Sequence, residues 1–286
     1  MEDLKIIECP RDAMQGISEF IPTTTKIDYI NDLLKVGFHT VDFGSFVSPK
    51  AIPQLRDTAD VLKKLDLSKS HSKLLAIVAN ERGAQDASNF EEIKYLGYPF
   101  SVSETFQQRN TNASIEDSVN RLEKINAIAS KANKEMVVYL SMGFGNPYGD
   151  PWGPEIVIEW AQKLVDRFGI KIVALSDTIG VAEPGVITSL FNELVPALPE
   201  VEFGAHLHTT PDTFHEKVKA AYNSGCRRFD GAIKGFGGCP MAKDDLTGNM
   251  PTEKMVDWFI EHNIATGLNE TALKQAIQQS TYVFHK

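Results

Sequence analysis

Short apolar runs alternate with longer segments of helical spacing along almost the whole chain. β-prone runs occupy residues 4–8, 40–43, 74–78, 98–102, 136–140, 171–175, 201–208 and 228–231. Apolar residues at helical spacing follow the first of these runs at 22–36, where Gly37 ends the pattern. Regular alternation of strand and helix predicts a parallel sheet, and eight such units favour a closed (β/α)₈ TIM barrel over an open sheet.

The remaining helices have recognisable beginnings. Ser114 is typical of a helix N-cap, and Pro154 and Pro184 suit the first position of a helix. Helices are predicted at 59–62, 89–96, 114–132, 156–168, 213–223, 252–261 and, as an extra C-terminal helix, at about 270–282. No linker or low-complexity segment interrupts the chain, so residues 1–286 are expected to form one catalytic domain.

An open doubly wound α/β sheet is the alternative fold. Such a sheet usually has a glycine-rich phosphate-binding loop after its first strand. In this chain the segment after the first strand is Cys-Pro-Arg-Asp, at residues 9–12, and we expect it to be a loop at the end of that strand. The closed barrel is therefore the favoured interpretation.

Composition restricts the partners and the compartment. The net charge is −9 with no run of basic residues, which argues against nucleic acid or an anionic membrane as partner. The N-terminus does not resemble a signal peptide, and no apolar stretch reaches the roughly 20 residues needed to span a bilayer. The three cysteines are too few for a disulfide framework, so we expect a reduced, cytoplasmic protein.

The strand at 201–208 ends in His-x-His. Side chains two residues apart on a strand point to the same side, so His206 and His208 present two imidazoles together. Two neutral imidazoles are a natural half of a divalent-metal site. The alternative is one histidine in the core and one at the surface.

Other strands also end in polar residues. The active site of a (β/α)₈ barrel lies at the carboxyl ends of its strands, so these residues are expected at one mouth. A single aspartate is more often a solvated loop residue, but Asp12 would complete a ligand set with the two histidines. One carboxylate and two neutral imidazoles leave a divalent ion positively charged, as a Lewis acid requires. Non-haem iron oxygenases use a similar set, but usually on other folds. The strand-end residues are Arg11, Asp12, Asp42, Ser45, Asn80, Glu104, Ser141, Asp177, Thr178, His206, His208 and the segment 235–249.

Cys239 lies in a loop unlike the surroundings of the other cysteines. The loop reads Gly-Phe-Gly-Gly-Cys-Pro-Met-Ala-Lys at 235–243, and its glycines permit motion and close approach to a ligand. Cys9 and Cys226 are expected to be inert buried residues. Cys239 is instead a candidate for a reactive or proton-transferring thiol.

With these features, the chain resembles the 3-hydroxy-3-methylglutaryl-CoA lyases, a family of metal-dependent TIM-barrel lyases, from about residue 6 to 267. The resemblance is most specific in the Gly-Gly-Cys-Pro loop followed by Thr-Gly-Asn at 247–249. Further motifs are Pro-Arg-Asp-x-x-Gln at 10–15, Ser-Phe-Val-Ser-Pro-Lys at 45–50, Ser-Glu-x-Phe at 103–106, Asn110 before Ser-Ile-Glu at 114–116, Asp-Thr-Ile-Gly at 177–180 and His-x-His.

The resemblance implies an activity and residue roles. The activity is reverse Claisen-type cleavage of 3-hydroxy-3-methylglutaryl-CoA to acetyl-CoA and acetoacetate, with Mg²⁺ or Mn²⁺ as cofactor and a homodimer as the assembly. Asp12, His206, His208 and Asn249 would hold the metal. Arg11 would hold the thioester carbonyl, Asp12 or His206 would be the base, and Cys239 a mobile general acid. Substrate contacts would come from Arg11, Gln15, Ser45, Asn110 and Asp177.

The chain also departs from the family pattern. Asp42 stands where the family usually has a glutamate, and the first motif is one residue shorter than expected. The other departures are Thr209 for an aspartate, Asn146 for a cysteine and Met241 for a tyrosine. A lyase for a related 3-hydroxyacyl-CoA, an aldolase on a free 2-keto acid and a metal-binding protein without turnover are the alternatives. For Arg11, the alternative is an ion pair with a nearby acid such as Glu8 or Asp42.

Overall fold

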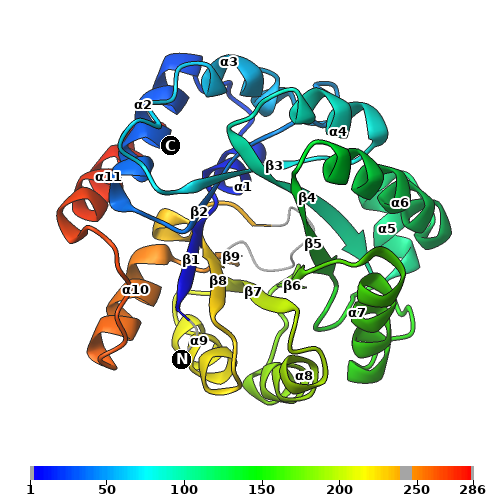
Figure 1. The fold of residues 1–286 in the computed structure, drawn as a ribbon. Coiled ribbons are helices and arrows are strands. Elements are labelled where there is room, and N and C mark those ends of the chain that lie inside the picture. Colours follow the sequence, from blue (N-terminus) through cyan, green and yellow to red (C-terminus); the bar gives the residue numbers. More distant parts are fainter. Residues whose placement is uncertain (1–2, 239–246, 285–286) are drawn as a thin grey trace.

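The computed structural model describes residues 3–238 and 247–284, which form a closed barrel of parallel strands (Figure 1). From β1 to β8 each strand pairs with the next, and the pairing of β8 with β1 completes the ring. This confirms the (β/α)₈ barrel. The strands are Lys5–Glu8 (β1), Thr40–Ser45 (β2), Lys73–Ile77 (β3), Ile93–Ser101 (β4), Glu135–Ser141 (β5), Ile172–Asp177 (β6), Glu202–Thr209 (β7), Arg228–Gly231 (β8) and the short antiparallel Gly248–Asn249 (β9).

The helices surround the strands, as Figure 1 shows. The predicted C-terminal helix is confirmed as α11, which packs against α2. No helix in the described part of the chain is long and apolar enough to cross a membrane. The helices are Pro10–Gln15 (α1), Thr23–Val36 (α2), Thr58–Leu62 (α3), Glu81–Ser88 (α4), Glu104–Thr111 (α5), Ile115–Lys131 (α6), Pro154–Phe168 (α7), Pro184–Ala197 (α8), Phe214–Asn223 (α9), Thr252–Glu261 (α10) and Glu270–Val283 (α11), with 3₁₀ turns at Pro53–Leu55 and Ile233–Gly235.

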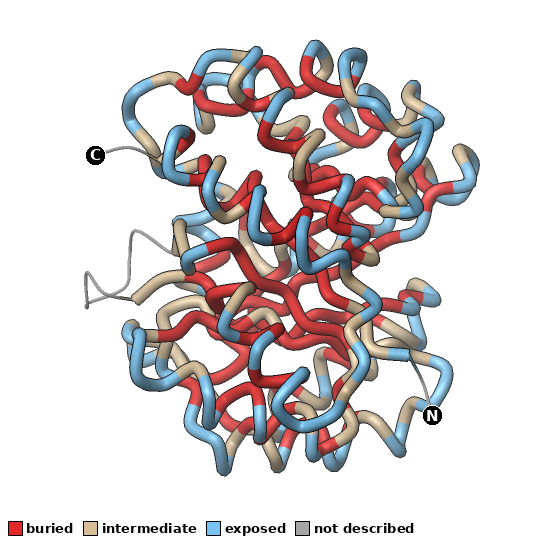
Figure 2. The backbone as a smooth tube through the Cα atoms, turned by 90° about the vertical axis from the view of Figure 1, so that its left-hand side faces the viewer, coloured by how far each residue is buried: buried red, intermediate tan, exposed pale blue. Residues whose placement is uncertain are grey.

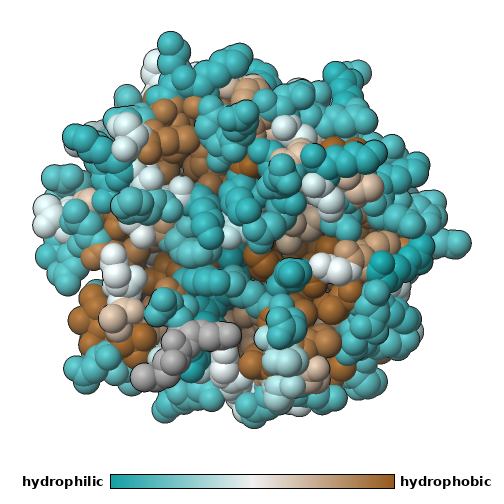
Figure 3. Space-filling model, viewed as in Figure 1, coloured by the Kyte–Doolittle hydropathy of each residue, from teal (hydrophilic) through white to brown (hydrophobic). Residues whose placement is uncertain are grey.

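The apolar side chains form two clusters, because alternate residues of each strand face opposite sides of the sheet. The larger cluster joins the outer side of the strands to the helices. The smaller one includes Leu75, Ile77, Val137 and Tyr139 from β3 and β5 and fills the inside of the barrel. Figure 2 shows the resulting buried centre, and in Figure 3 hydrophilic residues cover much of the face seen in Figure 1.

The helix predicted at 89–96 is wrong. The helix of this unit is α4, whose N-terminus is capped by Asn80, with the side chain accepting a hydrogen bond from the Gly83 N–H. Residues from Ile93 onward are already part of β4, where Ile93 pairs with Leu74 of β3. Strand pairing within the closed barrel thus determines the structure here, and a local apolar pattern cannot reveal it.

The segment at 9–12 is not the loop that we expected. Pro10 is the first residue of the short helix α1, where its fixed φ suits the helix and its missing N–H leaves no bond unmade. α1 starts two residues after β1 ends. The short helix that directly follows the first strand therefore carries Arg11, Asp12 and Gln15.

Glu8 joins β1 to the 3₁₀ turn at Ile233–Gly235 and to the first residue of α10. One carboxylate oxygen accepts the Ile233 N–H at 2.9 Å, and the other accepts the Thr252 hydroxyl at 2.6 Å. The side chain is fully buried, and burial raises the pKa of Glu8 from 4.5 to about 8 in spite of these two hydrogen bonds. Glu8 is therefore protonated in the folded protein at neutral pH.

Glu8→Gln is expected to change how stability depends on pH. Between pH 4.5 and about 8 the folded state holds a proton on Glu8 that the unfolded state has lost, so the stability that this group contributes falls as pH rises through that window. Glutamine mimics the protonated acid. The variant should match the wild type near pH 4.5 and exceed it at pH 8 by about 2–5 kcal/mol, measured by urea unfolding. A difference between the two proteins that stays constant with pH would contradict this explanation.

Candidate metal centre

Asp12, His206 and His208 come together although the first lies about 200 positions from the other two. The ligand atoms of the three side chains all lie within 4.8 Å of one another. The two histidines share the inner face of β7, while β1, which leads into α1, pairs with β8, the neighbour of β7. Barrel closure thus places Asp12 beside the histidine strand, as the sequence analysis expected.

Both imidazoles are held through Nδ1. His208 Nδ1 lies 3.0 Å from the Thr178 carbonyl oxygen, which can only accept, so the proton of His208 is on Nδ1. His208 Nε2 is buried and has no hydrogen-bond partner among the described residues. A buried, unprotonated nitrogen directed toward a carboxylate and a second imidazole fits a divalent metal.

The two histidines differ in their surroundings. His206 Nδ1 lies 3.1 Å from the carboxylate of Asp230. Burial alone would lower the pKa of His206, but the hydrogen bond to Asp230 and its charge raise it above the ordinary value. Burial lowers the pKa of His208, and the neighbouring His206 adds to this effect.

Asn249 lies next to the three ligands. β9 pairs with the end of β7, with Asn249 opposite His208. The Asn249 amide nitrogen donates to Asp12 Oδ2 and to the Phe236 carbonyl oxygen, both at 2.8 Å. Since both amide hydrogens are used, the amide oxygen is the atom of Asn249 that remains able to bind a metal.

Arg11 connects the ligand group to a buried acid. Its Nη1 donates to Asp12 at 2.7 Å and to Gln15 at 3.1 Å, while Nε and Nη2 donate to Asp42. Gln15 also donates to Asp12 at 2.7 Å. The ion pair with Asp42 required by the alternative interpretation of Arg11 is therefore present. One N–H of Nη2 has no partner in the described part of the chain, so it remains available to a ligand.

Burial and charge act in opposite directions on the two acids beside Arg11. Burial tends to raise the pKa of Asp12, but the charges of Arg11 and both histidines outweigh it and lower the pKa to about 2. Asp42 has no exposed surface, and burial raises its pKa to about 6 even though Arg11 favours the ionised form. Asp12 is therefore the carboxylate that stays ionised most readily.

Both carboxylate oxygens of Asp177 already accept hydrogen bonds from residues outside the ligand group. One oxygen accepts from Lys217 Nζ at 2.7 Å and the other from the Ala182 N–H at 3.0 Å. Lys217 Nζ also donates to the His208 carbonyl oxygen at 2.8 Å. These contacts hold the end of β7 in place, whereas the substrate contact expected for Asp177 stays a prediction.

Two other predicted substrate contacts, Ser45 and Asn110, have no hydrogen bond to the ligand group among the described residues. Ser45 ends β2 and accepts the Val47 N–H at 3.2 Å, next to a pocket of about 290 Å³. Asn110 lies on the exposed face of α5, and no hydrogen bond among the described residues joins it to the ligand group. Their roles stay predictions.

Cys9 and Cys226 are free and buried. Both were expected to be inert core residues, and burial raises both pKa values. Cys239 and Met241 lie outside the described residues.

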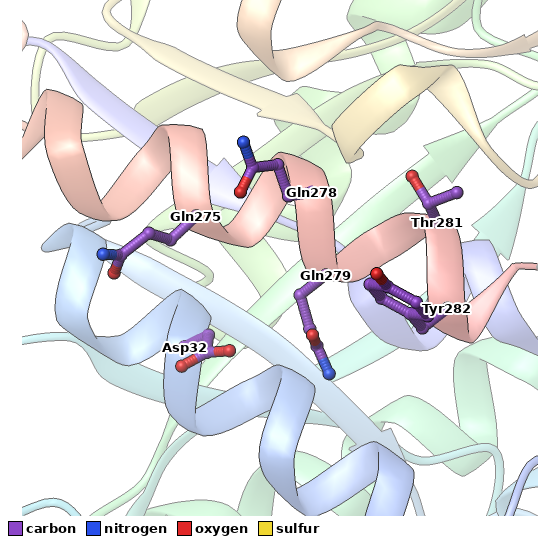
Figure 4. A pocket seen from close by; sticks show the side chains of 6 residues that line it. All are labelled: Asp32, Gln275, Gln278, Gln279, Thr281 and Tyr282. Atoms are coloured by element: carbon purple, nitrogen blue, oxygen red, sulfur yellow. The ribbon is translucent and has the colours of Figure 1, made fainter.

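A wider groove of about 680 Å³ lies away from this chemistry. Figure 4 shows it between α2 and α11, lined by Asp32 and by amide and hydroxyl side chains of α11. Asp32 is already paired with Lys35 at 2.7 Å. None of the predicted site residues lines this groove, so its size does not make it the functional site. The α11 residues are Gln275, Gln278, Gln279, Thr281 and Tyr282.

Comparison with known proteins shows the family of the chain. The family model described as HMGL-like matches residues 4–279. The chain belongs to the HMGL-like family. The hydroxymethylglutaryl-CoA lyase of Bacillus subtilis is 36% identical over 93% of this chain and 88% of its own length.

Solved structures give the same result. The crystal structure of the Bacillus subtilis HMG-CoA lyase has a TM-score of 0.91 at 34% identity, covering 99% of this chain and 94% of that one. An HMG-CoA lyase from Acinetobacter baumannii, in complex with coenzyme A and 3-methylmalate, has a TM-score of 0.89 at 30% identity and covers 98% and 91%. This HMGL-like chain is accordingly a lyase with the barrel of that family.

Two departures from the family pattern have a structural explanation. The Asn146 side chain accepts the N–H groups of Tyr148 and Asp150 and donates to the Asp150 carbonyl oxygen, so it shapes its own loop. Thr209 is buried and pairs with Gly248 of β9. In this HMGL-like protein, Asn146 and Thr209 thus stabilise the local backbone.

Sequence reasoning missed Asp230 and Lys217. Asp230 pairs across the sheet with His206. The sequence did contain a sign of it, namely a carboxylate between Phe229 and Gly231 in a strand that is otherwise expected to be buried. Lys217 is a buried lysine within α9, and spacing offered no signal for it because its partners come from other elements.

Lys217→Met is expected to destabilise the protein by about 3–5 kcal/mol, because Asp177 would keep a buried charge without its partner. Urea unfolding at neutral pH measures this loss. Adding Asp177→Asn should recover much of it, and the exposed Lys219→Met on the same helix should change stability by about 0.5 kcal/mol or less. Equal effects at the two lysines would contradict the importance of the buried pair.

Proposed function

We propose that this lyase cleaves 3-hydroxy-3-methylglutaryl-CoA to acetyl-CoA and acetoacetate and requires a divalent metal. The observation that supports this most is the convergence of Asp12, His206 and His208 within 4.8 Å, with Arg11 hydrogen-bonded to Asp12. The family of the chain and the names of its relatives support the substrate.

Asp12, His206, His208 and the Asn249 amide oxygen would hold the metal, for which we propose Mg²⁺ or Mn²⁺. Oxygen ligands suit both ions, and imidazoles are compatible with Mn²⁺. When bound, the metal supplies Lewis acidity for the hydroxyl and carboxylate oxygens of the substrate. The ionised Asp12 keeps the site attractive to a cation despite the nearby charge of Arg11.

Proton transfer begins the reaction. The predicted bases for the proton of the C3 hydroxyl are Asp12 and His206, whose ligand atoms lie close together. When His206 Nε2 holds the metal and His206 Nδ1 is bonded to Asp230, Asp12 is the group of the two that still has a free lone pair. The C2–C3 bond then breaks, its electron pair goes to the acetyl-CoA fragment as an enolate, and the C3 oxygen becomes the ketone of acetoacetate. Cys239 is proposed to protonate the enolate carbon.

Arg11 is proposed to stabilise the enolate oxygen. Asp42 fixes the guanidinium through Nε and Nη2, which leaves one N–H of Nη2 for the substrate. A donor held in place before the reaction lowers the barrier, because it needs no reorganisation as charge develops. The Arg11–Asp42 pair thus supports a catalytic role of Arg11.

The pocket beside Ser45 is proposed to take part of the coenzyme A moiety. Its lining includes the end of β2, Asn80, Arg56, Arg82 and Asp86. Arg82 lies 3.8 Å from Asp86, so Arg56 is the cation that we propose meets the phosphate groups. Arg56 is oriented by Phe20, whose ring centre lies 3.7 Å from the guanidinium carbon.

The cytoplasmic location and the homodimer stay predictions. Cys9 and Cys226 are free in the described part of the chain, which supports a reducing compartment.

Turnover of 3-hydroxy-3-methylglutaryl-CoA tests the proposal. The purified protein with Mg²⁺ or Mn²⁺ should release acetoacetate and acetyl-CoA in equal amounts, and chelation of the metal should abolish the reaction. His208→Ala should lose bound metal and turnover together, because it removes a direct ligand. Pyruvate release from a free 4-hydroxy-2-keto acid, with no cleavage of the CoA ester, would show the aldolase alternative to be correct.

Arg11→Lys should lower kcat by at least about a hundredfold, on the scale of a lost oxyanion donor, with little change in KM. Lysine keeps the charge but loses the planar fork that Asp42 and Asp12 hold in place. Steady-state kinetics with measured metal content provides the test. If kcat stays within a few-fold, Arg11 only pairs with Asp42.

A further inference from the structure

Asp230 contacts His206 of the candidate metal centre but does not belong to the predicted ligand set. It lies on β8 directly opposite His206 in the β7–β8 pairing, and its Oδ2 is 3.1 Å from His206 Nδ1. Its exposed fraction is 3%. A carboxylate so buried has few possible roles beyond contacts with its immediate neighbours.

We propose that Asp230 is a positioning residue that fixes His206 in the Nδ1–H tautomer and so presents Nε2 to the metal. An ionised carboxylate only accepts hydrogen bonds, so the proton between the two side chains belongs to the imidazole. The lone pair of His206 is then on Nε2, the same atom that His208 offers. This inference rests on the metal site proposed above.

The two imidazoles are therefore oriented by acceptors of different kinds. His208 relies on the main-chain carbonyl of Thr178, which no substitution removes. His206 relies on a side chain that carries charge. A carboxylate behind a ligating histidine fixes the ring and also raises its basicity as a ligand.

Arg228 is a buried cation close to Asp230 on β8. The two residues are two positions apart on β8 and share its inner face. Arg228 is fully buried; its Nη1 donates to Glu202 at 2.9 Å, whereas its Nε and Nη2 have no partner among the described residues. Burial lowers the pKa of Arg228, but the charge of Asp230 raises it above the ordinary value. No hydrogen bond among the described residues joins Arg228 to Asp230, and Asp230 Oδ1 has no partner there either, so the two side chains interact through charge alone.

Cys9 offers a different explanation of the same geometry. Its sulfur, His206 and Asp230 place ligand atoms within 4.8 Å of one another, which is a second possible metal-binding group. That group would need His206 Nδ1, which already carries the proton in the bond to Asp230. A thiolate ligand also suits soft metals, whereas Mg²⁺ and Mn²⁺ prefer oxygen. Cys9 therefore serves as a matched control.

Asp230→Asn in the full-length protein tests the inference by Mn²⁺ titration. Asparagine has the same shape, but its amide can donate to Nδ1 and so favour the wrong tautomer. We expect Mn²⁺ to bind about 10- to 100-fold more weakly. Cys9→Ser should bind Mn²⁺ like the wild type, and thermal unfolding confirms that each variant folds.

The tautomer can be read directly in the unmodified protein. ¹⁵N spectra of labelled histidines in metal-free wild type, at a pH where His206 is neutral, should show Nδ1 protonated and Nε2 unprotonated, with His206→Gln for assignment. A wild-type His206 protonated on Nε2 would overturn the inference whatever the variants do. If Asp230→Asn binds Mn²⁺ as tightly as the wild type, the role of Asp230 is overturned but the proposed metal site is not. If the wild type binds no Mn²⁺, the metal site and this inference fail together.

Discussion

A carboxylate removed from water must have a partner, and this constraint accounts for most of the polar architecture of the barrel mouth. Asp42, Asp177 and Asp230 are each at most 3% exposed. Their partners are Arg11, Lys217 and His206 respectively. Breaking such a pair costs several kcal/mol because the remaining charge is left unsolvated, so each acid dictates where its partner lies.

Each of these partners belongs to the candidate chemistry or supports it. Asp42 holds the guanidinium proposed to meet the enolate, and Asp230 orients one imidazole. Asp177 binds the lysine that donates to the His208 main chain. Asp12 differs from these three acids, because cations and imidazoles surround it and its pKa is lowered to about 2. The candidate site therefore combines three acids that position their partners with one acid, Asp12, that is proposed to bind the metal.

The closed barrel makes this arrangement possible at low cost in conformational entropy. Except for Lys217, which lies within α9, every group named above lies on a strand or within a few residues of its end, so the ladder of the sheet fixes its backbone. The shorter first motif and Asp42 in place of a glutamate are compatible with this scheme, since α1 begins directly after β1 and Arg11 still reaches Asp42. The fold thus tolerates changes in side-chain length as long as the charge pairs survive.

The sequence by itself determined the barrel, the histidine pair and Asp12 as their carboxylate, because periodicity and spacing are local properties that survive without coordinates. The family motifs further indicated Arg11 and Asn249, which the structure places against Asp12. Tertiary structure alone decided that residues from Ile93 onward form a strand, since pairing with β3 outweighs a local helical pattern. It also decided that Asp230 lies behind His206 and that Lys217 reaches Asp177, because those contacts depend on which strands and helices become neighbours when the barrel closes.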